Sequence, residues 1–189
     1  MTSKIRQALE TIHPISENDW SIIEPLFVKK EYLRNEFILR RGEIEKYLYF
    51  IESGILRSYV DRNESEVTLE FSFQETIFCS YSSFLTQTQS QVDVQAITDL
   101  TIWRIGFDDL QKVYLETSIG NLIGRVACEI QYLEKSNREL SLLTKTAEER
   151  YLDLFKEQPA LIQNIPLKYI ASYIGITPQA LSRIRKRIS

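Results

Sequence analysis

The chain has 189 residues, of which 43% are hydrophobic and 26% are charged, and its 23 basic and 26 acidic residues give a formal net charge of −3. This composition is ordinary for one or two globular domains, and it excludes a protein that coats nucleic acid through overall positive charge. No run approaches the ~18 apolar residues of a membrane span and no apolar signal core follows the N-terminus, so we expect a cytoplasmic protein without membrane contact.

Residues that hold metals or do covalent chemistry are scarce. The two cysteines, Cys79 and Cys128, are far apart, and His13 is the only histidine. Two thiols cannot hold a four-thiolate iron–sulfur cluster, and a cupin-type metal oxygenase needs several histidines. The chain also lacks GxSxG, HExxH and P-loop patterns. The sequence therefore predicts no metal, no resident cofactor and no enzymatic activity.

In chain order, residues 4–12 and 16–27 have helical patterns, and Ser16 with Asp19 three residues later resembles a capping box. From residue 28 to about residue 107 the pattern changes to short alternating runs separated by polar turns. Many short strands at this spacing predict a β-sandwich or barrel.

A long helix is predicted over residues 118–143. It has residues suited to a core at alternating spacings of four and three: Ile119, Ile123, Val126, Ile130, Leu133, Asn137 and Leu140. A single Asn in such a seam fixes the register and oligomeric state of a two-stranded coiled coil. The pattern favours a homodimer that forms through this helix, and the alternative is a core helix that packs on its own barrel.

The last 25 residues, 165–189, predict two helices joined by a tight turn. The first helix has an apolar stripe with the small residue that a close helix crossing needs: Leu167, Ile170, Ala171 and Ile174. Gly175 can end this helix in a left-handed conformation without strain. Thr177 is a good N-cap and Pro178 a good first residue, so a second helix follows at once.

The second helix predicts a contact with double-stranded DNA. Its apolar face has Leu181, Ile184 and Ile188, and residues 158–189 contain five basic residues and no acidic one. Arginine can bind guanine through two hydrogen bonds, glutamine can bind adenine, and lysine neutralises phosphate. We expect Gln179 and Arg183 to contact bases, and Lys168, Arg185 and Arg187 to contact phosphates. The full set of expected DNA contacts is Lys168, Thr177, Gln179, Ser182, Arg183, Arg185, Lys186 and Arg187. The alternative is a helical hairpin with a solvated basic end.

The order of β-barrel, long helix and C-terminal helix pair resembles the Crp/Fnr superfamily of bacterial transcription regulators. Residues 37–57 look like the early strands of that family's β-roll with their two turn glycines, and residues 165–187 closely resemble its helix-turn-helix. Arg183 takes the place of the family's base-reading arginine. The short C-terminus is similar to a Bacteroidetes form that lacks the wing hairpin.

The resemblance implies an α+β protein in three parts. These are a cyclic-nucleotide-binding-type β-roll sensor over residues 1–117, a dimerisation helix over 118–144, and a helix-turn-helix domain over 145–189. It also implies that the partners are double-stranded DNA, a second copy of the chain, and RNA polymerase.

One departure from the family concerns its phosphate-binding cassette. Members that bind cyclic AMP hold the ribose with a glutamate and the phosphate with an arginine; here Ser80 and Ser90 take those places, and Gln91 takes the place of a serine. No Arg or Lys occurs between Arg62 and Arg104. Without a cation a buried phosphate is poorly compensated, so we expect no cyclic AMP binding. A neutral or polar effector and a solvated loop both remain open. The candidate pocket residues are Arg57, Ser80, Tyr81, Ser82, Ser83, Ser90 and Gln91.

Together these features predict a homodimeric, DNA-binding transcription regulator. The alternative is a ligand-sensing β-roll protein that acts through a protein partner without specific DNA binding. A gel shift on random DNA at low salt distinguishes the two.

Overall fold

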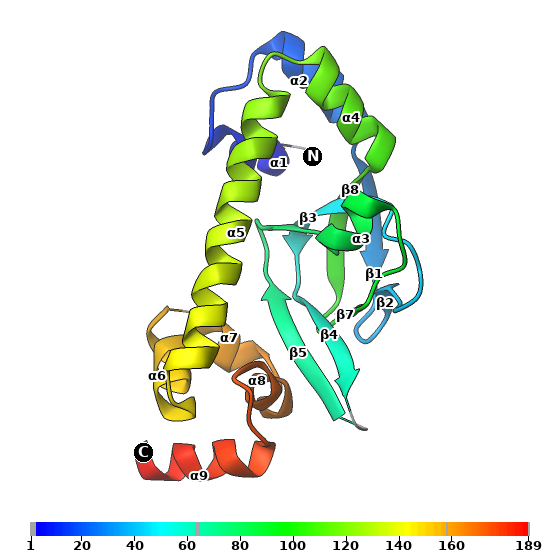
Figure 1. Ribbon diagram of the computed structural model, residues 1–189. Coiled ribbons are helices and arrows are strands. Elements are labelled where there is room, and N and C mark those ends of the chain that lie inside the picture. Colours follow the sequence, from blue (N-terminus) through cyan, green and yellow to red (C-terminus); the bar gives the residue numbers. More distant parts are fainter. Residues whose placement is uncertain (1–2, 63–64, 158, 189) are drawn as a thin grey trace. The chain divides into compact units, whose positions relative to one another are not determined.

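The computed structural model describes residues 3–62, 65–157 and 159–188 (Figure 1). The chain forms two compact units. The first unit comprises residues 1–58 and 71–130, and the second comprises residues 59–70 and 131–189.

The secondary structure confirms the predicted α+β class, with a β-roll, a long helix and C-terminal helices. Its elements in chain order are α1 (Ser3–Glu10), α2 (Glu17–Ile23), the 3-10 helix η1 (Glu24–Leu26), β1 (Val28–Tyr32), β2 (Phe37–Leu39), β3 (Tyr47–Ser53), β4 (Leu56–Arg62), β5 (Ser65–Ser72), β6 (Ile77–Phe78), α3 (Tyr81–Thr86), β7 (Asp93–Ala96), β8 (Leu100–Gly106), α4 (Phe107–Glu116), α5 (Gly120–Thr144), α6 (Ala147–Glu157), α7 (Pro159–Asn164), α8 (Leu167–Tyr173) and α9 (Pro178–Ile188).

The roll is built from two four-stranded sheets, with strand orders β1-β8-β3-β6 and β2-β7-β4-β5. In the first sheet, β3 pairs antiparallel with β8 so that Tyr49 lies opposite Arg104. Successive side chains of a strand point to opposite faces. Tyr49 and Ile51 therefore join a buried cluster with Leu56 and Val94 of the other sheet, which places this core between the sheets.

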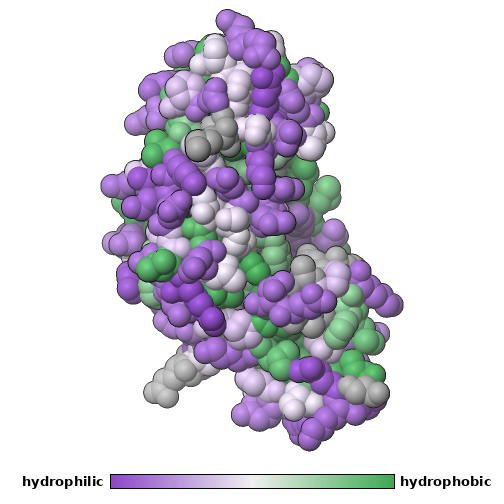
Figure 2. All heavy atoms as spheres, turned by 180° about the vertical axis from the view of Figure 1, so that it is seen from behind, coloured by the Kyte–Doolittle hydropathy of each residue, from purple (hydrophilic) through white to green (hydrophobic). Residues whose placement is uncertain are grey.

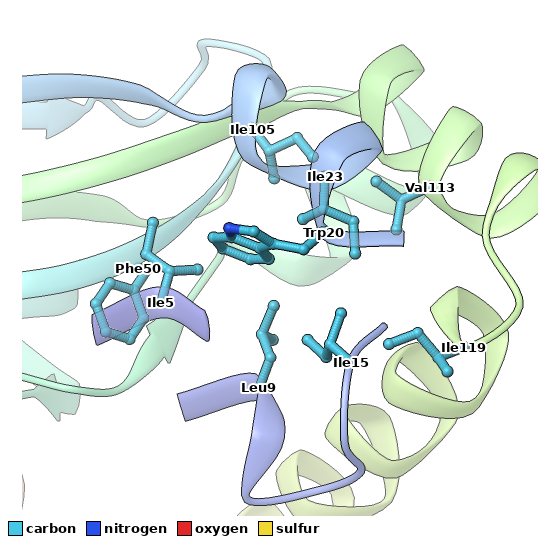
Figure 3. Close-up of a cluster of buried hydrophobic side chains, with 9 residues drawn as sticks. All are labelled: Ile5, Leu9, Ile15, Trp20, Ile23, Phe50, Ile105, Val113 and Ile119. Carbon is cyan, nitrogen blue, oxygen red and sulfur yellow. The ribbon is translucent and has the colours of Figure 1, made fainter. Parts of the chain in front are cut away.

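The outer face of the first sheet is covered by helices. Phe50 of β3 packs there in a second buried cluster, with side chains from α1, α2, β8, α4 and the start of the long helix. Figure 3 shows Trp20 in the middle of this cluster, with Leu9 and Ile23 close to its ring. Trp20 is only 7% exposed, so the N-terminal helices form part of the core of the first unit.

The expected capping box at the start of α2 forms in one direction only. The Asp19 backbone N donates to the Ser16 hydroxyl at 3.1 Å, so Ser16 is the N-cap. The Asp19 carboxylate does not return the bond, because it accepts from the backbone N and the hydroxyl of Ser118, at 3.1 and 2.6 Å. These two bonds lower the pKa of Asp19 and join α2 to the segment that precedes α5.

Helix α5 changes its environment along its length. Ile119, immediately before the helix, is 6% exposed and packs in the chain's own core, and Ile123 packs against the same core. Further along the helix, Ile130, Leu133 and Leu140 are 46%, 59% and 56% exposed. Ile119 was predicted to be the first residue of the dimer seam, but it is already buried within one chain.

The surface drawn in Figure 2 is mostly hydrophilic, with separate hydrophobic patches. Among the described residues, no helix combines the length and the apolar character that crossing a membrane requires.

Candidate DNA-binding helix and effector cassette

The turn between α8 and α9 forms as the sequence predicted. Gly175 has a φ of +79°, and its N–H donates to Ser172 O at 3.1 Å. The N–H of Ile176 donates to Ala171 O at 2.9 Å, which completes a Schellman motif at the end of α8. The Ala180 N–H donates to the Thr177 hydroxyl at 3.2 Å, so Thr177 caps α9. Local chemistry therefore fixes where one helix ends and the next begins.

Buried apolar residues hold α8 and α9 together. Ile170, Ala171 and Leu181 are at most 1% exposed, whereas Leu167 and Ile188 are 41% and 38% exposed at the outer ends of the pair. The predicted apolar stripes are therefore buried at their centres and exposed at their ends. The opposite face of α9 has polar residues, all exposed: Gln179, Ser182, Arg183 and Lys186.

Two basic residues of α9 have partners on α6. Arg187 forms an ion pair with Glu148, and the Arg185 side chain hydrogen-bonds to the hydroxyl of the buried Tyr151. Lys168, on α8, lies over the Tyr169 ring at 4.7 Å. Arg185 and Arg187 were both expected to contact phosphates, and a phosphate would have to compete with these internal partners.

The two key cassette positions lie together and bind each other. The hydroxyls of Ser80 and Ser90 are 3.1 Å apart, and the residues are 8% and 1% exposed. The Ser90 hydroxyl also donates to Val92 O at 2.9 Å. A serine hydroxyl has one proton, so Ser80 is the donor in the Ser80–Ser90 pair. Both hydroxyls are therefore engaged within the chain, and neither supplies the positive charge that a cyclic phosphate needs.

The other cassette candidates lie in different environments. The buried Ser83 hydroxyl donates to Thr88 O at 2.5 Å and accepts from the Glu45 backbone N at 3.0 Å. Tyr81, Ser82 and Gln91 are exposed, and the Tyr81 hydroxyl lies 2.7 Å from the Cys128 sulfur. The seven candidate pocket residues are thus not brought to one surface.

Arg57 of β4 is the one positively charged residue among the candidate pocket residues. The residue is 1% exposed, and its guanidinium donates to Gln95 Oε1 through Nε and Nη2, at 3.3 and 2.9 Å. Its neighbour Leu56 belongs to the core between the sheets, so strand alternation directs Arg57 to the opposite face. The cassette serines supply no positive charge, and the Arg57 guanidinium is engaged with Gln95.

The sequence profile described as Cyclic nucleotide-binding domain matches residues 29–117. Among solved structures, FixK2 from Bradyrhizobium japonicum is similar with a TM-score of 0.74 at 18% identity, over 86% of this chain and 84% of that one. A CooA variant from Carboxydothermus hydrogenoformans is similar with a TM-score of 0.72 at 18% identity, and the match covers 96% of this chain and 83% of that one. A structure described as a putative transcriptional regulator of the Crp/Fnr family from Eubacterium rectale has a TM-score of 0.71 at 16% identity, and the match covers 92% of this chain and 83% of that one. No curated protein sequence matches the chain.

The chain shares the fold of these three structures. The resemblance to the Crp/Fnr superfamily that the sequence indicated is confirmed at the level of the fold.

One buried carboxyl of the roll has no recognisable signal in the sequence. Glu45, in the loop before β3, is 0% exposed, and its Oε1 accepts from the Tyr49 hydroxyl at 2.8 Å and from the Tyr47 backbone N at 3.1 Å. Burial raises the pKa of Glu45, although these hydrogen bonds and a backbone bond from Ser80 oppose the shift. Burial also raises the pKa of the neighbouring Cys79 thiol. In the sequence, Glu45 lies in a charged loop segment and resembles a solvent-exposed residue.

Proposed function

We propose that this chain is a DNA-binding transcription regulator that acts as a homodimer and whose β-roll does not use cyclic AMP. The observation that carries the proposal is the exposed polar face of α9, with Gln179, Arg183 and Lys186, on a helix whose other face is fixed to α8. A helix held in this way can enter the major groove and present side chains to base edges.

Within this proposal the contacts have separate roles. Gln179 and Arg183 contact bases, while Ser182, Lys186 and Thr177 support the docking of α9. Phosphate contacts hold the register of the helix on the duplex and come from Lys168, Arg185 and Arg187. Because Arg187 pairs with Glu148 and Arg185 with Tyr151, these two arginines exchange internal partners for phosphates on binding.

The second half of α5 supports the homodimer. Ile130, Leu133 and Leu140 expose large apolar side chains at heptad spacing, and Asn137 lies exposed between the last two. Val126, which is half-buried, continues the same line toward the start of the helix. A second copy of the chain would cover this stripe and place two recognition helices about one helical turn of DNA apart.

The family profile and the fold support a sensor role for the roll, but the cassette supports a ligand other than cyclic AMP, or none. The phosphate of a cyclic nucleotide would meet the mutually bonded Ser80 and Ser90. A regulator of this type acts with RNA polymerase, in the cytoplasm, and needs no enzymatic step.

The test is selection of bound sequences from a random pool of double-stranded DNA, using the full chain. We expect a two-fold symmetric motif whose half-sites lie about one helical turn apart. Recovery of no enriched sequence, together with no gel shift at low salt, would contradict the proposal and favour a sensor that acts through a protein partner.

A further inference from the structure

The edge of strand β5 is covered by helix α8 within the second unit. In the order of the described strands, β5 is the last of its sheet, so its outer backbone groups have no neighbouring strand. The Ser172 hydroxyl of α8 fills this place: it donates to Glu66 O at 2.6 Å and accepts from Thr68 N at 2.7 Å. One side chain thus makes the two bonds that a partner strand would make.

Two arginines complete the C-terminus of α8. The last four carbonyls of a helix lack helical partners. In the Schellman turn the carbonyls of Ala171 and Ser172 accept backbone hydrogen bonds. The carbonyls of the next two residues accept hydrogen bonds from arginine side chains. Arg138 Nη2 donates to Tyr173 O at 2.8 Å, and Arg150 Nε donates to Ile174 O at 2.9 Å. Cations at a helix C-terminus also interact favourably with the helix dipole.

Arg138 joins three elements at once. It lies on α5, its Nη2 also reaches Thr68 O of β5 at 3.4 Å, and its guanidinium carbon lies 3.7 Å from the centroid of the Tyr173 ring. Lys135, one turn earlier on α5, forms an ion pair with Glu70 of β5. The strand, the long helix and α8 are therefore connected through directional bonds.

The pose of α8 determines the pose of α9. The turn between them is fixed by the positive φ of Gly175 and by the Schellman bonds, and Ile170 and Leu181 are buried. A displacement of α8 from β5 would therefore move the recognition helix with it.

We propose that Ser172 and Arg138 are positioning residues that make strand β5 a structural part of the DNA-binding unit and set the pose of α9. This inference rests on the proposed function. Neither residue would touch DNA; each would act on sequence discrimination through α8.

The first test compares Ser172→Ala, Ser172→Thr and Ser65→Ala in the full chain. Ser65→Ala is the matched control, because its hydroxyl bonds to Arg62 O in the same hairpin and not to α8. The measured quantities are affinity for the selected operator and affinity for random DNA at the same salt concentration. We expect Ser172→Ala to lose about tenfold in operator affinity with little change on random DNA, since a buried backbone group left unpaired is costly while phosphate contacts remain. We expect Ser172→Thr, which keeps a hydroxyl, to retain most of the operator affinity, and Ser65→Ala to behave like the wild type.

Hydrogen exchange tests the contact itself. The Thr68 amide should exchange at least about tenfold faster in Ser172→Ala than in the wild type or in Ser65→Ala, because its acceptor has been removed. Arg138→Lys keeps the charge but loses the planar fork, so it should weaken operator binding in the same direction. Its matched control is Arg125→Lys, an exposed residue of α5 paired with Glu129.

Two results would overturn the inference. One is an unchanged Thr68 exchange rate in Ser172→Ala, which would show that the contact is not made. The other is an equal loss of affinity for operator and random DNA, which indicates general destabilisation. If the wild type selects no DNA sequence, the proposed function and the positioning role both fail, while the exchange measurement still reports separately on the contact.

Discussion

The cassette of the first unit and helix α9 of the second are both rich in polar side chains, but those of the cassette are largely buried and those of α9 are exposed. In the cassette, Ser80, Ser83 and Ser90 are buried and bond within the chain. On α9, Gln179 and Arg183 are exposed. A hydroxyl that is already bonded offers little to a charged ligand, whereas an exposed guanidinium can approach a base or a phosphate. The cassette hydroxyls therefore stabilise the fold of the first unit, whereas the polar side chains of α9 are available to a ligand.

The largest expected effect concerns cyclic AMP. With hydroxyls in place of both charged anchors, we expect affinity to be weaker by three or more decades than in a cassette that has them, since each ~1.4 kcal/mol is tenfold. Isothermal titration with cyclic AMP and cyclic GMP measures this. A low-micromolar dissociation constant would contradict the structural role of the cassette hydroxyls, and Arg57→Ala would then show whether that arginine supplies the missing charge.

The next effect concerns the exposed half of α5. Leu133→Glu would place two like charges in an apolar seam and should convert the dimer to monomers in analytical ultracentrifugation, with impaired DNA binding. Leu115→Glu is the matched control, because Leu115 of α4 is 84% exposed and lies outside the seam. A wild-type chain that sediments as a monomer at micromolar concentration would contradict the dimer.

Substitutions on α9 separate base contacts from phosphate contacts. Arg183→Ala should cost ~1–3 kcal/mol on the operator and relax sequence preference, because it removes a base contact. Arg187→Ala should weaken all sequences alike and reduce the salt dependence. Competition binding against random DNA at several salt concentrations measures both. Equal discrimination by the wild type and Arg183→Ala would show that Arg183 does not contact bases.

Removal of the internal partner of Arg187 gives a further, smaller effect. Glu148→Gln should release Arg187 for phosphate and modestly raise the affinity for every sequence, since an exposed ion pair contributes only ~0–1 kcal/mol. Lower affinity in the same binding assay would indicate that the ion pair supports the fold of the unit.

A pH effect is expected from Glu45 in the first unit. Because burial raises the pKa of Glu45 above its unfolded value, the contribution of this carboxyl to stability is largest at low pH and is lost as pH rises through the raised pKa. Each unit by which the pKa is raised costs about 1.4 kcal/mol once the carboxyl ionises. Glu45→Gln should remove this slope in urea unfolding measured from about pH 4.5 to pH 8. A parallel pH dependence in wild type and variant would show that Glu45 does not cause it.

The sequence predicted most of the second unit's helix pair because its signals are local. Gly175, Thr177 and Pro178 specify where α8 ends and α9 begins, and the structure follows them. The α+β class was also predictable, from period-two runs followed by a long helical pattern. The seam was only partly predictable, because heptad spacing cannot distinguish Ile119, which packs in its own chain, from Leu133, which is exposed. The three-part domain division and the site residues stay predictions.

By itself the sequence determined the order of the elements, the charge asymmetry of the C-terminus and the absence of cations from the cassette, since each depends on residues close together in the chain. Only the tertiary structure showed that Ser80 and Ser90 bond to each other, that Glu45 is buried, and that Ser172 caps the edge of β5. Ser172 and Thr68 are 104 residues apart in sequence, and Ser80 and Ser90 are 10 apart. Such contacts depend on how strands and helices pack, and no local pattern of residues encodes which hydroxyl meets which backbone group.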